Sequence, residues 1–298
     1  MQIKSRYKFL LVGTISNAED VFERDFKRVF NSLNKLGDVD VFLVESDSQD
    51  KTVNLLASLE RLHKGFKYKS LGKLETSISN RVERIRLCRN YYVEYIRQNN
   101  GSHNWDYVVV ADLDGMNSQI TSRKIARSLS TSSRWDACFA TQTFGYYDLY
   151  ALRAKNWVEK DVFEELEQLK RRHPFHKKSR FQSLNFLYAY WHFDKLRAEA
   201  IYSKMRHLTS GLIDVDSAFG GFAIYKSFVF QTFDYLPENV GVPYKCEHLD
   251  LHSKCKKSGL SLVIDSGLTN SYVNEYNLNR IKAIRFLREF KKYYFNRP

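Results

Sequence analysis

The chain has 298 residues, a hydrophobic content of 43% and a formal net charge of +13. This length and composition predict one compact domain with a sizeable core and argue against a disordered chain. No run reaches the roughly 18 to 20 apolar residues of a membrane-spanning helix, and the apolar stretch near the start is too short for a signal peptide. Four scattered cysteines without a CxxC pair argue against a zinc or disulfide scaffold, so we expect a cytoplasmic protein.

The positive charge predicts an anionic partner, which is nucleic acid, an anionic membrane surface or a phosphorylated substrate. The sequence contains no RNP, helix-turn-helix or zinc-finger pattern. We therefore do not expect sequence-specific binding to nucleic acid.

Short β-branched or aromatic runs alternate with helical periodicity along the first half, a pattern typical of βαβ units in a mainly parallel sheet. The expected strands cover Lys8 to Gly13, Val39 to Glu45, Phe66 to Leu71, Tyr107 to Ala111, Trp135 to Thr141 and Leu262 to Asp265. The expected helices cover Asp20 to Leu36, Asp50 to His63, Arg81 to Gln98 and Ser118 to Ser130. Ligands of such sheets bind at the carboxyl ends of the strands.

The sharpest motif is WDYVVVADLDG, in which a buried strand ends in Asp112 and Asp114 with Leu113 between them. Residues two apart on an extended chain point to the same side, so both carboxylates can face one hard cation. Mg²⁺ or Mn²⁺ bound there would neutralise charge on a leaving diphosphate. The alternative is that Asp114 and Gly115 simply form a turn.

The same string resembles the first motif of haloacid-dehalogenase phosphatases, where the first Asp of DxDG is the nucleophile. That family places the motif near the N-terminus and requires a later lysine and a strand ending in GDxxxD. Here two βα units precede the motif, and VIDSG, the nearest later match, lacks the second acid. The phosphatase remains an alternative, as does a non-catalytic basic binding module.

The motifs between residues 8 and 265 also resemble, in order, those of GT-A glycosyltransferases of the capsule and O-antigen type. The resemblance implies an α/β fold, a single GT-A (Rossmann-like) domain over residues 1–276 with a mainly parallel central sheet flanked by helices. Residues 1–115 would form the nucleotide-binding half, and residues 116–276 the sugar and acceptor half, with an insertion at about 145–208. It further implies Mn²⁺ or Mg²⁺ as cofactor and a UDP- or GDP-linked sugar as donor.

Several residues match the nucleotide-binding positions of that family. Thr14 ends the first strand, where it is otherwise an ordinary strand end. Glu45 and Asp47 end the second in VFLVESDSQDKT, where Asp47 or Ser48 has the alternative role of capping the following helix. Arg81 and Arg89 lie on a shared side of the helix NRVERIRLCRNYYVEYI, and Asp112 completes the set. An arginine there can bind diphosphate or brace the metal-binding loop, unless it belongs to a solvated basic face.

The sugar site is implied by two further segments. Tyr147 and Asp148 lie in FGYYDLYALR, which resembles the segment that lines the sugar site, although a tyrosine-rich stretch is also typical of packing. Gly220 and Gly221 in SAFGGFAIYK would let the backbone approach the donor sugar, or would form a bulge between strands.

The segment CEHLDLH resembles the acidic motif that supplies the catalytic base. Glu247 occupies its first acidic position, but His248 stands where the family has Asp, so the base is Glu247, His248 or Asp250, unless the segment is only a surface helix start. No histidine follows His252, so the family's third metal ligand cannot be transferred. Asp265, Asn270 or water would have to complete the metal shell.

The end of the chain, residues 277–298, is expected to form a basic amphipathic helix. Its apolar residues recur every three positions among seven Lys and Arg residues and one Glu, which suits an anionic membrane surface or docking on the protein's own sheet. We therefore expect a transferase that moves a sugar to a hydroxyl of a surface glycan or lipid-linked acceptor. It would work in the cytoplasm, and the helix would bring it to the inner face of the membrane.

Overall fold

The computed structural model describes residues 6–143, 146–159, 161, 164, 211–238 and 246–272. The expected C-terminal helix and most of the expected insertion lie outside the described residues. Within the described part, no helix is both long enough and apolar enough to cross a bilayer.

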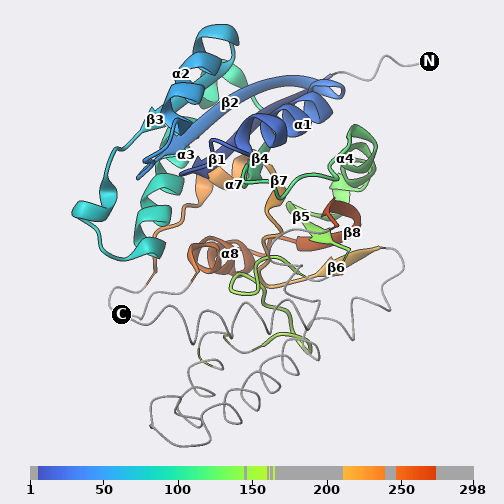
Figure 1. Ribbon diagram of the computed structural model, residues 1–298. Helices are drawn as coiled ribbons and strands as arrows, with labels where there is room; N and C mark the ends of the chain where they lie inside the picture. The colour runs from blue at the N-terminus through green and yellow to red at the C-terminus, as the bar shows by residue number, and fades with distance from the viewer. Residues whose placement is uncertain are drawn as a thin grey trace, which may run out of the picture.

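The described elements alternate between strands and helices over the first half of the chain (Figure 1). The strands are β1 (Tyr7–Ile15), β2 (Gly37–Glu45), β3 (Phe66–Ser70), β4 (Tyr107–Ala111), β5 (Ala137–Gln142), β6 (Leu212–Asp214), β7 (Phe222–Lys226) and β8 (Leu262–Ser271). The α-helices are α1 (Phe22–Asn34), α2 (Thr52–Leu62), α3 (Arg81–His103), α4 (Ser122–Leu129), α7 (Phe228–Thr232) and α8 (Glu247–Lys257), and the 3₁₀ turns are η1 (Leu74–Thr76) and η2 (Ser132–Arg134).

The described strands form one mixed sheet in the order β3-β2-β1-β4-β7-β5-β8-β6. The pairs among β1, β2, β3 and β4 are parallel, as is β5 with β8. Strand β7 lies antiparallel between β4 and β5, and β6 is antiparallel to β8. The α/β fold and its mainly parallel sheet are therefore confirmed, and the antiparallel pairs arise where β7 enters the middle of the sheet and β6 joins β8.

Helices cover both faces of the sheet, which explains the unbroken apolar runs in its central strands. Phe9 and Leu11 of β1 pack on the side of α1, α2 and α4, whereas Leu10 and Val12 pack on the side of α3, α7 and α8. The alternation follows from the two-residue period of a strand. Figure 1 shows β4 and β7 side by side although they are far apart in the sequence. The middle of the sheet is therefore formed by strands from distant parts of the sequence.

A backbone contact between β5 and the segment before β7 leaves no room for a side chain at Gly220, since a Cβ there would lie 2.1 Å from the carbonyl oxygen of Ala140. We expect Gly220→Ala to lower the free energy of unfolding by about 1–3 kcal/mol or more through overpacking. Urea denaturation measures the loss. Gly101→Ala is the matched control, because a Cβ at this helical position meets nothing within 4 Å and is expected to stabilise by about 0.5–1 kcal/mol. Equal stability of the two variants would contradict the tight approach.

Candidate active site

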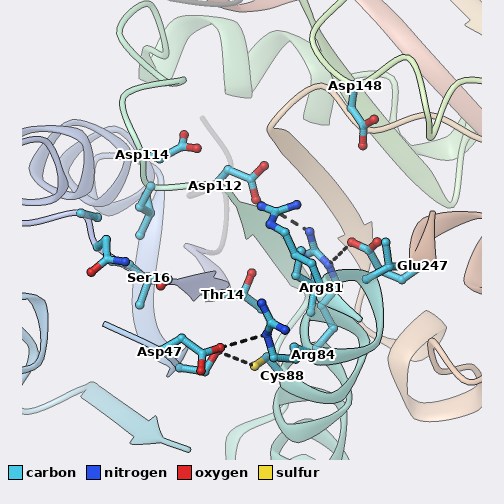
Figure 2. Close-up of a pocket in the computed structure, with 18 of the residues that line it drawn as sticks. Thr14, Ser16, Asp47, Arg81, Arg84, Cys88, Asp112, Asp114, Asp148 and Glu247 are labelled. Carbon is cyan, nitrogen blue, oxygen red and sulfur yellow. Dashed lines mark hydrogen bonds and ion pairs between the residues drawn. The ribbon is translucent and has the colours of Figure 1, made fainter. Parts of the chain in front are cut away.

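A pocket of about 710 Å³ lies at the carboxyl ends of β1, β2 and β4, between α3 and the start of α8 (Figure 2). The residues expected at the site that line it are Thr14, Asp47, Arg81, Arg89, Asp112, Asp114, Tyr147, Asp148 and Glu247. Those expected there that are not among its lining residues are Glu45, Gly220, Gly221, His248 and Asp250. Groups that are more than 200 residues apart in the sequence thus meet in one cavity.

The DLD segment forms a loop directly after β4, and its alternate side chains point to opposite sides. Leu113 is buried in the core on the side of α1, whereas Asp112 and Asp114 line the pocket. Figure 2 shows both carboxylates beside the cavity. Burial raises the pKa of Asp112, while Arg89 lowers it and the neighbouring Asp114 raises it further. A group of like charges held this close would gain from a bound cation.

The loop is held by a buried polar network behind it. Asp25 of α1 accepts hydrogen bonds from the backbone nitrogens of Gly115 (3.2 Å) and Asn117 (3.1 Å) and from Asn117 Nδ2 (3.1 Å). Asn117 Nδ2 also donates to the carbonyl oxygen of Asp112 (2.7 Å), and Asn270 Nδ2 donates to Asn117 Oδ1 (3.3 Å). The positions of the two carboxylates are therefore set by residues that do not touch the pocket.

Arg89 is the central cation of the site and is almost fully buried. Its Nε donates to Glu247 Oε1 at 2.8 Å, its Nη2 lies 3.8 Å from Asp112 Oδ1, and its Nη1 donates to the hydroxyl of Tyr92 at 3.3 Å. The guanidinium also lies over the ring of Phe219, 5.2 Å from its centroid. Arg89 thus joins the DLD loop, through an ion pair with Asp112, to the start of α8, through a charge-assisted hydrogen bond to Glu247.

Asp148 enters the pocket from the loop that follows β5. Its Oδ1 accepts hydrogen bonds from the backbone nitrogens of Tyr150 (3.0 Å) and Ala151 (3.2 Å), which fix the direction of the carboxyl group. Burial, followed by the nearby charge of Glu247, raises the pKa of Asp148 to about 6. The adjacent Tyr147 places its hydroxyl 3.5 Å from Asp114 Oδ2. Tyr147 and Asp148, which the sequence analysis predicts to bind the sugar, therefore lie beside the DLD loop.

The opposite end of the pocket is formed by the loop after β2 and the first turns of α3. Asp47 has a positive φ of 61°, accepts a hydrogen bond from the backbone nitrogen of Glu75 (2.8 Å) and pairs with Arg84 Nε (3.1 Å). Arg84 lines the pocket but was not expected from the sequence, although its position three residues after Arg81 on a helix places both on one side. This end combines hydrogen-bonding groups and cations.

The carboxylates at the end of β2 and in the loop after it differ in role, which the sequence pattern left open between ligand binding and helix capping. Glu45 is buried, accepts a hydrogen bond from the backbone nitrogen of Ser48 (2.9 Å) and bonds the hydroxyl of Ser70, so it braces the loop from behind. Asp50, and not Asp47, receives the backbone nitrogen of Thr52 at the start of α2 (3.0 Å). The carboxylate of Asp47 is turned to Arg84 instead, at the pocket.

Two of the three candidates for a base face away from the cavity. His248 is fully buried and stacks on the ring of Phe219 at 4.0 Å between centroids, and burial lowers its pKa well below the usual value. Asp250 lies one turn along α8, where Arg86 Nη2 donates to its Oδ2 at 2.9 Å. Successive helix residues are rotated by about 100°, so Glu247 can face the pocket while His248 faces the core.

The glycines and the candidate third ligands serve the framework in the described structure. Gly220 packs against β5, and its carbonyl oxygen accepts hydrogen bonds from Gln142 and Asn270, both at 2.7 Å. Gly221 has a φ of +79° and receives the backbone nitrogen of Asp112 (3.0 Å). Asp265 bonds Ser128 Oγ (2.6 Å). Neither Asp265 nor Asn270 lines the pocket.

The donor set fits a hard divalent cation that is only partly enclosed by protein. Asp112 and Asp114 supply carboxylate oxygens, which Mg²⁺ and Mn²⁺ accept. Within the described residues, no group of three or more His, Cys, Asp and Glu side chains is arranged to hold a metal. The remaining ligands would come from a bound diphosphate and from water, as is usual for Mg²⁺.

Fold and pocket together define an α/β protein with a polar, carboxylate-rich cavity at the strand ends. No family model and no curated protein matches the chain. Among solved structures, it is similar to the mannosyltransferase PcManGT from Pyrobaculum calidifontis in complex with GDP-Man and Mn²⁺, with 13% identity and a TM-score of 0.49, covering 99% of this chain and 66% of that one. It is also similar to residues 1–349 of S. aureus TarS, with 11% identity and a TM-score of 0.42, covering 93% of this chain and 64% of that one. The chain spans about two thirds of the length of both.

Proposed function

We propose that the chain is a metal-dependent glycosyltransferase that moves a sugar from a UDP- or GDP-linked donor to a hydroxyl of a surface glycan or lipid-linked acceptor. The observation that carries this proposal is the meeting of Asp112, Asp114, Arg81, Asp148 and Glu247 in one cavity at the carboxyl ends of parallel strands. Its volume of about 710 Å³ is within the usual range for sites of small ligands.

Each part of a nucleotide sugar has a matching group along the pocket. The base and ribose would lie at Thr14 and Asp47, and the diphosphate near Arg81 and the DLD loop. Asp112 and Asp114 would hold Mn²⁺ or Mg²⁺, which supplies charge neutralisation for the leaving diphosphate. The sugar would lie by Tyr147.

Arg89 would keep Asp112 in place, and Glu45 would support the nucleotide loop without touching the ligand. The acceptor proton would pass to a carboxylate at the pocket, for which the sequence motif favours Glu247. Gly220 and Gly221 would shape the sugar site through their backbone.

The phosphatase alternative finds less support in the cavity. That chemistry needs a nucleophilic carboxylate and a lysine that binds the phosphoryl group. Among the described residues, no lysine lines the pocket, and Asp112 has the guanidinium of Arg89 3.8 Å from its Oδ1. Six carboxyl groups line the cavity, which suits a bound cation.

A thermal-shift screen tests the function. UDP or GDP with Mn²⁺ is expected to raise the melting temperature by several degrees, because a ligand at 100 times its Kd stabilises the folded state by about 2.7 kcal/mol. Either nucleotide without metal should give a smaller shift. The donor sugars of the stabilising nucleotide are then assayed for nucleotide release.

Other outcomes would support the alternatives. Hydrolysis of p-nitrophenyl phosphate without any response to nucleoside diphosphates would favour the phosphatase. A protein that shows neither response would be a binding module, and the proposed transferase would be wrong.

A further inference from the structure

The proposed transfer needs a group that takes the proton from the acceptor hydroxyl. Asp148, in the loop after β5, and Glu247, at the start of α8, both line the pocket away from the nucleotide end (Figure 2). Their surroundings differ, and pairs of carboxyl groups in unlike surroundings commonly divide the acid and base roles.

Glu247 is tied into the framework by Arg89. Its Oε1 accepts the Nε–H of Arg89 at 2.8 Å, and both side chains are buried, with exposed fractions of 4% for Arg89 and 8% for Glu247. A proton placed on Glu247 would break this ion pair and leave a buried guanidinium without its main partner, which is costly. Glu247 is therefore suited to holding Arg89 and poorly suited to accepting a proton during each turnover.

Asp148 has the opposite surroundings. Two backbone N–H groups hold Oδ1 in place, while the donor to Oδ2 within the described part of the chain is the weak thiol of Cys246, at 3.8 Å. Among the described residues, no ion pair to Asp148 is formed by a lysine, arginine or histidine. Oδ2 is thus an oriented oxygen that can gain a proton without breaking an ion pair.

We propose that Asp148 is the catalytic base of the transfer and that Glu247 is a positioning residue for Arg89. This inference rests on the proposed function. In the step, Asp148 Oδ2 takes the proton of the acceptor hydroxyl, and the acceptor oxygen forms a bond to the anomeric carbon. The bond from that carbon to the diphosphate oxygen breaks, and its electron pair leaves with the nucleoside diphosphate. Asp148 then releases its proton to water.

The experiment uses water and azide as simple acceptors, so the natural acceptor need not be known. Water must lose a proton to a base when it attacks the sugar, whereas the azide anion carries no proton to lose. Nucleotide release from UDP- or GDP-sugars is measured for wild type, Asp148→Ala, Asp148→Asn and Glu247→Gln, with and without sodium azide. Glu238→Gln is the control, because Glu238 bonds Lys257 and does not line the pocket.

With water as acceptor, Asp148→Ala and Asp148→Asn are expected to lower nucleotide release by about 10²-fold or more, with donor binding in the thermal-shift assay retained. Azide is expected to restore most of the rate in Asp148→Ala, where the deletion makes room for it, and to yield the glycosyl azide. Glu247→Gln removes the charge that compensates Arg89 and should lower stability, but its amide oxygen can still accept the Arg89 hydrogen bond, so its loss of nucleotide release should be far smaller and insensitive to azide.

A pH profile gives a second readout. Among the described residues, the titratable groups around Asp148 are Glu247 and Cys246 at the start of α8, Arg89 of α3, Asp112 of the DLD loop and Tyr146 of its own loop. Because a base acts in its deprotonated form and the pKa of Asp148 is raised to about 6, wild-type release should fall as the pH drops through that value. Asp148→Asn should lose this limb of the profile.

The outcomes separate this inference from the function on which it rests. A wild type that releases nucleotide, with an Asp148→Asn variant of similar rate, would overturn the base assignment alone. Azide rescue in Glu247→Gln instead of Asp148→Ala would transfer the role to Glu247. A wild type that neither binds nor cleaves any UDP- or GDP-sugar would overturn the glycosyltransferase itself, and the base assignment with it.

Discussion

Asp114→Asn is expected to abolish Mn²⁺-dependent binding of a nucleoside diphosphate while the protein keeps its fold. The amide removes the negative charge and one of the oxygen ligands that a hard cation requires. Asp114 is exposed at the pocket, so its substitution should change the free energy of unfolding by no more than about 0.5 kcal/mol. The thermal shift produced by nucleotide with Mn²⁺ measures the binding.

The matched control is Asp38→Asn, the same chemical change at the start of β2, where the carboxylate is 71% exposed and pairs with Arg6 at 3.8 Å. This variant should respond to nucleotide and Mn²⁺ like the wild type. If Asp114→Asn also responds like the wild type, the metal assignment to the DLD loop is wrong.

Arg89→Met is expected to be among the most destabilising single substitutions in the chain. It leaves the buried carboxylate of Glu247 without its cation, and removal of one member of a buried ion pair costs about 3–5 kcal/mol. Arg89→Lys should recover only part of the loss, since an ammonium cannot bond Glu247, Asp112 and Tyr92 with the same planar fork. Urea denaturation of each variant measures the free energy of unfolding.

Two further variants show whether the loss comes from the pair. Arg89→Met combined with Glu247→Gln should be more stable than Arg89→Met alone, because the uncompensated charge is gone. Arg97→Met, on the same helix, removes a 38% exposed arginine that lies 3.6 Å from Asp234, and should cost no more than about 1 kcal/mol. Similar losses in Arg89→Met and Arg97→Met would show that the buried pair contributes little.

The elements of the first half could be predicted from the sequence because their apolar periodicity is local. The expected strand Tyr107 to Ala111 agrees with β4, and the other predicted strands overlap β1, β2, β3, β5 and β8 with shifted ends. Strand β7 was not predicted, since Phe222 to Lys226 is short and its place between β4 and β5 depends on long-range pairing. The parallel pattern of the first half gives no sign of this antiparallel insertion.

The pocket was predicted best where strand geometry decides the direction of a side chain. The alternation of Asp112, Leu113 and Asp114 is visible in the sequence, and the structure places Leu113 in the core. The motif at the start of α8 did not reveal that His248 turns inward to Phe219, because that depends on the rotation of a helix against its neighbours. Cys246 and Arg84 also line the pocket; the helical spacing from Arg81 indicates Arg84, whereas no local pattern distinguishes Cys246.

The network behind the DLD loop bears on the order in which the molecule folds. Asn117 bonds Asp25, 92 residues earlier, and Asn270, 153 residues later, so the loop depends on both α1 and β8. We expect contacts across such separations to form late, because the loop-closing entropy is lost before they are gained. Residues 1–115 therefore contain both carboxylates but not Asn117 or Asn270, and a fragment of this length would lack the framework that orders them. We therefore expect the site to be completed only when β8 joins the sheet.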